Sequence, residues 1–222
     1  MSIARRGPSN PLQRRSADSL FLQYWLFWVT LGETVGFLAP ALAQLAFAAS
    51  PVRIPALILA GAVEGAVLGW TQANVLRSRL PALSRARWVG ATALGAAVAW
   101  FIGLLPAEWA DVWQRWPAAG QATAGLVAAS VLLTVIGIAQ RAELSRHCRG
   151  AAWWIAGSAA AWCAGLIVFF AVATPLWQPG QPAVLVLLIG VLAGVLMAFT
   201  MALVSWLVLL RLLPIKTPSQ PV

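Results

Sequence analysis

One long, uncharged and strongly apolar stretch of the chain decides its fold. Residues 183–210 read AVLVLLIGVLAGVLMAFTMALVSWLVLL and contain no charged side chain over 28 positions. About 20 helical residues are enough to cross the hydrocarbon core of a bilayer. The stretch also lacks the strict two-residue alternation that is typical of a transmembrane β-strand. We therefore predict a membrane-spanning helix here.

Five further stretches share this character, so the chain has six predicted spans. They are 20–47, 54–75, 88–105, 121–139, 151–173 and 183–210. Apolar residues make up 61% of the chain and charged residues 9%, against ~45–50% and ~25% in soluble domains. This composition excludes a soluble enzyme, a disordered chain and a fibrous protein. Helices satisfy their own backbone hydrogen bonds where water is missing. We therefore predict an all-α fold, a polytopic transmembrane bundle of six helices.

Lysine and arginine are distributed unequally between the connections. Thirteen of the 15 lie in the N-terminal tail, in the connections after the second and fourth spans, or beyond the sixth span, and only Arg53 and Arg115 lie elsewhere. Cytoplasmic loops carry the excess of basic residues in membrane proteins. We therefore predict that both termini of this multi-pass membrane protein are cytoplasmic. Anionic lipid headgroups at that face account for the net charge of +9, and no nucleic-acid partner is expected.

The predicted domain organisation follows from these spans. A basic cytoplasmic tail covers 1–19, the six-helix domain covers 20–213, and a second cytoplasmic tail covers 214–222. The first span, with a small-residue site at 41–43, resembles a signal peptide. Its apolar run is longer than the 7–15 residues of a signal core, so we interpret it as a retained helix.

Tryptophan is abundant, with 13 residues in the chain. Several lie near the predicted inner ends of spans, among them Trp25, Trp28, Trp88 and Trp154. Tryptophan is enriched at membrane–water interfaces. We therefore interpret these residues as an interfacial aromatic belt.

One pattern occurs twice along the chain. The motif Gly-x-x-Gln at 69–72 and at 137–140 is followed each time by a basic connection and then by Trp-(Val/Ile)-x-x-(Thr/Ser), which begins at Trp88 and at Trp154. A weaker copy begins at Trp28. We interpret the chain as three tandem helical hairpins, at about 20–79, 86–146 and 151–213, related as parallel repeats about an axis along the membrane normal.

Small residues recur at four-residue spacing in several spans. Such spacing places them on one helix face, where they let two helices approach closely. The predicted helix-packing residues are Gly32, Gly36, Gly61, Gly65, Gly69, Gly157, Gly165, Gly190 and Gly194. The same faces would also suit packing against another membrane protein or a second copy of the chain.

The order of features over residues 64–106 resembles a group of uncharacterised bacterial six-span integral membrane proteins. The matching positions are Glu64-Gly65, Gly69, Gln72, Val75-Leu76-Arg77, Leu80-Pro81, Arg87-Trp88-Val89, Thr92, Gly95 and Gly103-Leu104-Leu105-Pro106. The resemblance covers about a fifth of the chain. It implies an inner-membrane location and a six-helix hairpin architecture, and it carries no activity.

Two acidic residues fall inside predicted spans. Glu33 lies about 18 Å and Glu64 about 20 Å from the cytoplasmic ends of their helices, at 1.5 Å per residue. The first two spans are antiparallel, so we expect both carboxyl groups at nearly one depth, near the midplane. No lysine, arginine or histidine lies at that depth in any span. An ionised, unpaired carboxylate would cost several kcal/mol there, so we expect one or both to be protonated.

Two interpretations of this pair stay open. In one, Glu33 and Glu64 form a binding site, with Thr30, Thr71 and Gln72 as further candidate binding residues. In the other, the two acids form hydrogen bonds between helices, or to nearby threonines, and only set the packing register. In the repeat alignment, small residues near Ala93 and Ala159 correspond to Glu33, so this polarity belongs to one hairpin alone.

Other chemistry is sparse in the sequence. It contains no Gly-x-x-x-x-Gly-Lys-(Ser/Thr) loop, no Gly-x-Ser-x-Gly elbow and no His-Glu-x-x-His motif. We therefore expect no catalytic residues, no metal and no cofactor, and predict a non-enzymatic membrane protein. The leading hypothesis is proton-linked binding or transport of a small solute around the two glutamates. The alternative is an accessory or structural subunit, which predicts a dry interior in place of a cavity.

Overall fold

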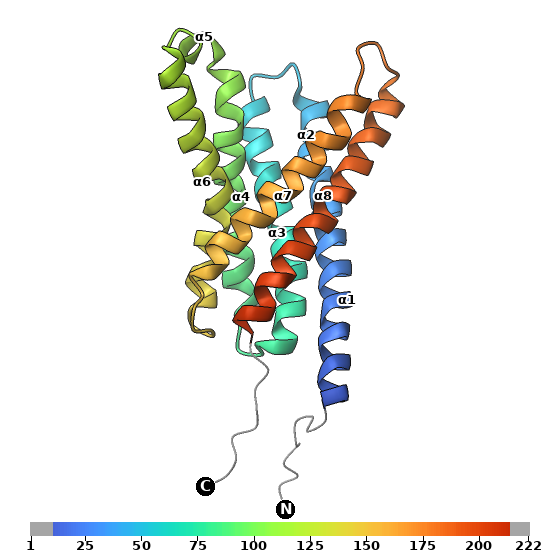
Figure 1. The fold of residues 1–222 in the computed structure, drawn as a ribbon. Helices are drawn as coiled ribbons and strands as arrows, with labels where there is room; N and C mark the ends of the chain where they lie inside the picture. Colours follow the sequence, from blue (N-terminus) through green and yellow to red (C-terminus); the bar gives the residue numbers. More distant parts are fainter. Residues whose placement is uncertain (1–10, 214–222) are drawn as a thin grey trace, which may run out of the picture.

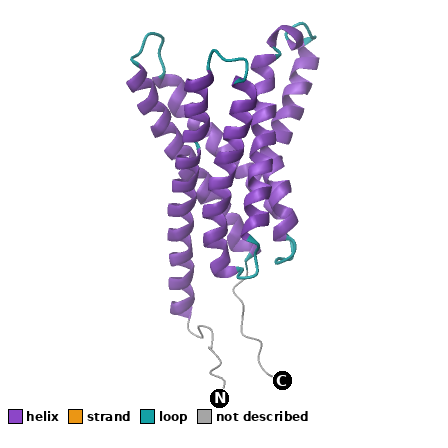
Figure 2. Ribbon diagram, turned by 180° about the vertical axis from the view of Figure 1, so that it is seen from behind, coloured by secondary structure: helices purple, strands orange, loops and turns teal. Residues whose placement is uncertain are grey.

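A computed structural model describes residues 11–213, and all regular elements within that range are helices (Figures 1 and 2). The helices are α1 (Pro11–Gly36), α2 (Leu38–Phe47), α3 (Arg53–Arg79), α4 (Arg85–Glu108), α5 (Ala110–Trp113), α6 (Ala118–Leu144), α7 (Trp153–Leu176) and α8 (Ala183–Leu212). Six candidate spans are long and apolar enough to cross a membrane, the first formed by α1 and α2 together. The protein is therefore an all-helical, multi-pass membrane protein. The predicted tails at 1–10 and 214–222 lie outside the described residues.

The first span is broken where a single helix was predicted. Helix α1 ends at Gly36 and α2 begins at Leu38. Pro40 has no backbone N–H to donate to the carbonyl of Gly36, so the hydrogen-bond ladder loses one rung at this point. The chain resumes a helical course with the bond from the Ala41 N–H to the Phe37 carbonyl at 3.2 Å.

The six spans form a closed ring. Each packs against the preceding and following spans, and α8 returns to pack against α1. Helix α3 packs most extensively on α4, and α7 on α8, so these contacts do not by themselves divide the ring into the three predicted hairpins. Figure 1 shows α7 and α8 strongly inclined to the other helices, so that the bundle is wider at the end opposite the chain termini.

Glycines allow the closest approaches between helices. A Cβ atom at Gly65 would lie 2.7 Å from the Thr92 carbonyl oxygen of α4, and one at Gly36 would lie 3.0 Å from the Glu64 carbonyl oxygen of α3. Of the other predicted packing residues, Gly32, Gly61, Gly69, Gly157 and Gly165 also lie against side chains of a neighbouring helix. Gly190 has only the Trp177 ring at 3.7 Å, and Gly194 has no such neighbour within 4 Å in the described chain.

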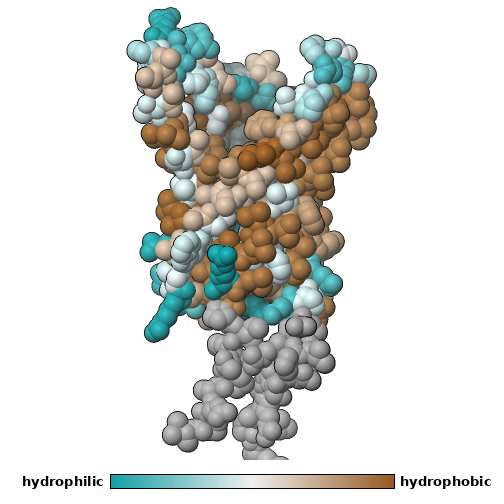
Figure 3. Space-filling view, in the orientation of Figure 1, coloured by the Kyte–Doolittle hydropathy of each residue, from teal (hydrophilic) through white to brown (hydrophobic). Residues whose placement is uncertain are grey.

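The outer surface of the ring is apolar. Figure 3 shows a hydrophobic band around the middle of the molecule, with hydrophilic residues towards both ends. The connections rich in arginine lie at the end where the chain termini lie (Figure 1). We call this the terminal end. Here Glu143 of α6 is almost fully buried and accepts hydrogen bonds from the Ser84 N–H at 2.7 Å and from Arg87 Nε at 2.6 Å, which joins α6 to the start of α4.

Candidate functional site

A cavity of about 390 Å³ lies inside the ring of helices. All six spans contribute to its wall, which is apolar except for two acidic residues, Glu33 and Glu64. Leu68 and Ile136 lie at its lower boundary, towards the terminal end. Gly103 and Phe170 line its wall and are also exposed on the molecular surface. The cavity therefore reaches the surface on the side away from Leu68 and Ile136.

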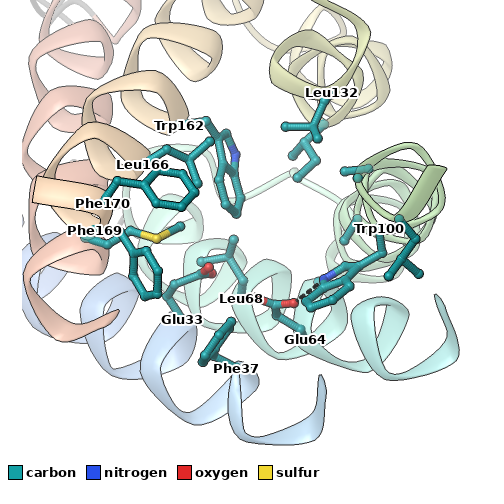
Figure 4. Close-up of a pocket in the computed structure, with 17 residues that line it drawn as sticks. Glu33, Phe37, Glu64, Leu68, Trp100, Leu132, Trp162, Leu166, Phe169 and Phe170 are labelled. Carbon is teal, nitrogen blue, oxygen red and sulfur yellow. Dashed lines mark hydrogen bonds between the residues drawn. The ribbon is translucent and has the colours of Figure 1, made fainter. Parts of the chain in front are cut away.

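Glu33 lies in α1, one turn before the break at Phe37. Its residue is only 3% exposed; its carboxyl group interacts with that of Glu64, and no other described residue forms a hydrogen bond with it. Figure 4 shows its side chain pointing into the cavity. An acid that is buried with only a second acid beside it is costly when ionised.

Glu64 lies opposite, in α3, and is 6% exposed. Its Oε2 atom accepts a hydrogen bond from Trp100 Nε1 of α4 at 2.6 Å (Figure 4). Gly61, one turn earlier in α3, leaves room for the Trp100 ring. The two carboxyl groups are close enough to interact electrostatically. Both carboxyl groups line one cavity, and the expectation that they lie at one depth near the membrane midplane stays a prediction.

No basic side chain lines this cavity, so neither acid has a counter-ion in the described chain. A carboxylate ion in such surroundings is strongly disfavoured relative to the neutral acid. A proton or a cationic ligand would remove this cost. The arrangement can thus exchange a proton for a positively charged group.

A polar network closes the cavity towards the terminal end. Gln140 Nε2 donates to Gln72 Oε1 and to Thr92 Oγ1, both at 2.9 Å. Trp88 Nε1 donates to Gln72 Oε1 at 3.2 Å, and Trp154 Nε1 donates to Gln140 Oε1 at 2.8 Å. All five residues are buried. Every polar side chain in this network therefore has a partner. We call this layer the floor.

The floor is completed by a third tryptophan, Trp25 of α1. Its Nε1 atom donates to Ser205 Oγ at 3.1 Å and to the Ala202 carbonyl at 3.0 Å, both on α8. Trp25, Trp88 and Trp154 are at most 1% exposed. The prediction that these three belong to an interfacial belt is therefore wrong. Their indole N–H groups have acceptors inside the bundle, and this allows complete burial.

A small space of about 20 Å³ lies within the floor. It is bounded by Gln72, Gln140 and Ser205 and is about the size needed for one water molecule. Leu68 and Ile136 line both this space and the large cavity. These two apolar residues therefore stand between the acidic cavity and the polar floor.

The candidate binding residues from the sequence fall in different places. Glu33 and Glu64 meet in the cavity, whereas Gln72 belongs to the floor. The Thr71 hydroxyl donates to the Leu68 carbonyl at 2.8 Å, and its side chain lies against Gly32. The Thr30 hydroxyl is buried without a partner in the described range and does not line the cavity. The hydrogen bonds expected between the acids and nearby threonines are therefore not formed.

Sequence reasoning missed the aromatic part of the wall. Phe37, Trp100, Trp162, Phe169 and Phe170 all line the cavity. A usable signal was present, because Trp100 and Trp162 lie twelve and eight residues after the tryptophans of the twofold motif. In a helix of 3.6 residues per turn, spacings of eight and twelve residues end only about 40° apart around the axis, so both select one common face.

Comparisons with known proteins found no matching family model, no matching curated protein and no matching solved structure. No group of three or more metal-ligating side chains occurs in residues 11–213. The resemblance noted over residues 64–106 stays a prediction, and the case for function depends on the geometry of the cavity.

Proposed function

We propose that this protein is a non-enzymatic, multi-pass protein of a bacterial cytoplasmic membrane that binds and transports a small solute in exchange for protons at Glu33 and Glu64. The observation that carries the proposal is a pair of buried acids, Glu33 and Glu64, that share one wall of a 390 Å³ cavity without a basic side chain beside them. Proteins retain intramembrane ionisable residues mainly where they serve a function. A bound cation or a proton would compensate the charge of this pair.

The alternative, an accessory subunit, has weaker support. It requires a dry interior and small-residue faces left open to lipid. Most of the predicted glycine faces are instead occupied within the chain, as at Gly36 and Gly65. Among the predicted packing glycines in the described residues, Gly190 and Gly194 of α8 are the two that no neighbouring helix covers closely.

Orientation follows from the arginines. The terminal end carries the arginine-rich connections, so we assign it to the cytoplasm by the positive-inside rule, in contact with anionic headgroups. The floor then separates the cavity from the cytoplasm, and the rim at Gly103 and Phe170 faces the outer half of the membrane. In Figure 3 the surface is hollowed between the α6 side and the α7–α8 side at that end.

The cavity also supports the proposed threefold repeat, with one change of register. Trp25 is fully buried and hydrogen-bonded like Trp88 and Trp154, whereas Trp28 is only partly buried. Eight residues after the three buried tryptophans lie Glu33, Ala96 and Trp162, and all three line the cavity. The equivalents of Glu33 therefore become Ala96 and Trp162, in place of residues near Ala93 and Ala159.

Two further sets of cavity residues occur at equal spacings in the three proposed repeats. Twelve residues after the tryptophans lie Phe37, Trp100 and Leu166, and eight residues before Gln72, Gln140 and Ser205 lie Glu64, Leu132 and Met197. All six line the cavity. The cavity would thus lie on the axis of the repeat, and acids would occupy only two of the equivalent positions.

Proton movement in reconstituted liposomes tests this function. A panel of small cations, anions and neutral solutes is added to liposomes that hold an imposed pH gradient, and the gradient is followed with a pH-sensitive dye. We expect at least one solute class to dissipate it with the wild type and with Asp111→Asn, an exposed site outside the cavity. The double variant Glu33→Gln/Glu64→Gln should not respond. Equal behaviour of all three proteins, with only the double variant losing thermal stability, would favour the structural role.

A further inference from the structure

We infer that the solute is a monovalent organic cation with an apolar body, bound with its charge at Glu33 and its body against the aromatic wall. This inference names the substrate class and rests on the proposed function. It comes from three features of the cavity: its charge, its aromatic lining and its size.

The charge of the lining selects a cation. Two carboxyl groups face the cavity and no arginine, lysine or histidine does, within the residues that the structure describes. An anion would find no basic side chain in this lining to compensate its charge. A neutral sugar-like solute would need many hydrogen-bonding groups, and the rest of the wall is apolar. A cation supplies the counter-charge that both acids lack.

The hydrogen bonds of the two acids point to a single positive charge. Glu64 has a donor in Trp100 Nε1, which partly satisfies its carboxyl group. Glu33 has no such donor from another helix, and its carboxyl group interacts only with that of Glu64. One cation at Glu33 would therefore give each of the two carboxyl groups a partner, and a second cation would have no comparable site.

The aromatic wall suits a bulky cation better than a metal ion. Trp100, Trp162, Phe37, Phe169 and Phe170 surround the acids. The faces of such rings attract organic cations, most strongly where water is excluded. A hard metal ion would require several oxygen ligands, and only two carboxyl groups are offered here.

The size agrees with this class. A volume of about 390 Å³ lies in the range of ~300–1,000 Å³ that is typical of sites for drug-sized molecules. Leu68 and Ile136 separate the cavity from the polar floor. A cation entering at the rim would therefore stop at Glu33 and Glu64, and one proton would leave the Glu33 carboxyl group as one cation binds.

Binding of a matched set of three probes to the full-length protein in detergent tests the inference. The probes are methyltriphenylphosphonium, the neutral triphenylphosphine oxide and the anion triphenylacetate, which share a similar apolar body. Isothermal titration in two buffers of different ionisation enthalpy gives the affinity and the number of protons released. We expect the wild type to bind the cation at least about tenfold more tightly than either other probe, with close to one proton released.

Variants locate the charge. Glu33→Gln should lose about tenfold or more in cation affinity and all proton release, and Glu64→Gln should lose less because Trp100 already satisfies that carboxyl. Asp111→Asn should bind like the wild type. Gly103→Leu, at the rim and away from both acids, should weaken all binding by filling the cavity, since a Cβ there already lies 3.6 Å from Leu132.

The proton count on the wild type needs no variant, so it stands even if an acidic variant is unstable. Equal affinity for cation and neutral probe, or preference for the anion, would overturn the cation inference. If binding of the neutral probe or of the anion were still accompanied by release or uptake of protons at Glu33, the proposed proton-linked function would survive. Binding of no probe, by a protein with normal thermal stability, would overturn the cation inference, and the liposome panel would then decide the proposed function alone.

Discussion

The floor and the cavity differ in the hydrogen bonding of their buried polar side chains. In the floor, near the terminal end, Gln72, Gln140 and Trp154 are all hydrogen-bonded to one another or to neighbours. In the cavity, about two helical turns further along the same helices, Glu33 interacts only with the second acid, Glu64, and its side chain points into the cavity. Satisfied polar groups hold helices in register, whereas ionisable residues inside a membrane segment are candidate functional sites.

The spacing between helices also differs between the floor and the cavity. Close glycine contacts, such as Gly69 against Thr92 and Gly137 against Ser158, lie beside the floor. Further up, α7 and α8 incline away from α6 (Figure 1), and large aromatic side chains line the gap without filling it. The same six helices thus provide a tight base and an open upper half.

The largest expected effect comes from breaking the floor. Gln140→Leu removes two donors and the acceptor of Trp154 Nε1, so a buried indole N–H is left unpaired. We expect the free energy of unfolding to fall by about 2–3 kcal/mol, measured by denaturant titration in detergent. Gln178→Leu is the control, because Gln178 is exposed and donates only to the nearby Pro175 carbonyl. Similar losses for both variants would contradict the structural role of the floor.

A smaller loss is expected from one added methyl group at the α3–α4 contact. Gly65→Ala places a Cβ 2.7 Å from the Thr92 carbonyl oxygen and 3.0 Å from the Ala93 Cα, both backbone atoms that cannot turn aside. We expect a loss of about 1–2 kcal/mol in unfolding free energy. Gly194→Ala, where the added methyl meets nothing within 4 Å, should change it by less than about 0.5 kcal/mol. If the two alanine variants were equally stable, helix separation at α3–α4 would have to be larger than described.

The smallest effect, of opposite sign, is expected at the unpaired acid. Glu33→Leu replaces a buried carboxyl group that interacts only with a second acid, Glu64, with an apolar side chain of similar size. We expect unfolding free energy to stay the same or to rise by about 0.5–1 kcal/mol, in the assay used for Gln140→Leu. A clear loss of stability would instead show that Glu33 holds the helices together.

Much of the fold could be predicted from hydropathy. All six spans were located. Most helix ends lie a few residues beyond the predicted ones, because polar residues such as Arg77 and Arg79 continue the last turn of α3, whereas α7 begins two residues after its predicted start. The break after Gly36 was missed, although Pro40 carries the signal for it. Closure of the ring by α1 and α8 depends on helix inclination, which no local pattern encodes.

The candidate site was only half predictable. The cost of acids in a membrane was enough to single out Glu33 and Glu64. The burial of Trp25, Trp88 and Trp154 was not foreseen, because tryptophan suits both an interface and a core, and only the positions of Gln72, Gln140 and Ser205 decide between them. The volume of the cavity depends on how far α7 stands from α6, which is a tertiary property.

Chemical accessibility of two neighbouring positions on α1 tests the central contrast most directly. In a background with Cys148→Ala and Cys163→Ala, which removes both native thiols, Glu33→Cys and Val29→Cys are each treated with a small cationic thiol reagent in liposomes. Val29 lies one turn below Glu33, is 1% exposed and borders only the small space of the floor. We expect rapid labelling at position 33 and little at position 29. Equal labelling at both positions, or none at position 33, would contradict an open acidic cavity above a closed floor.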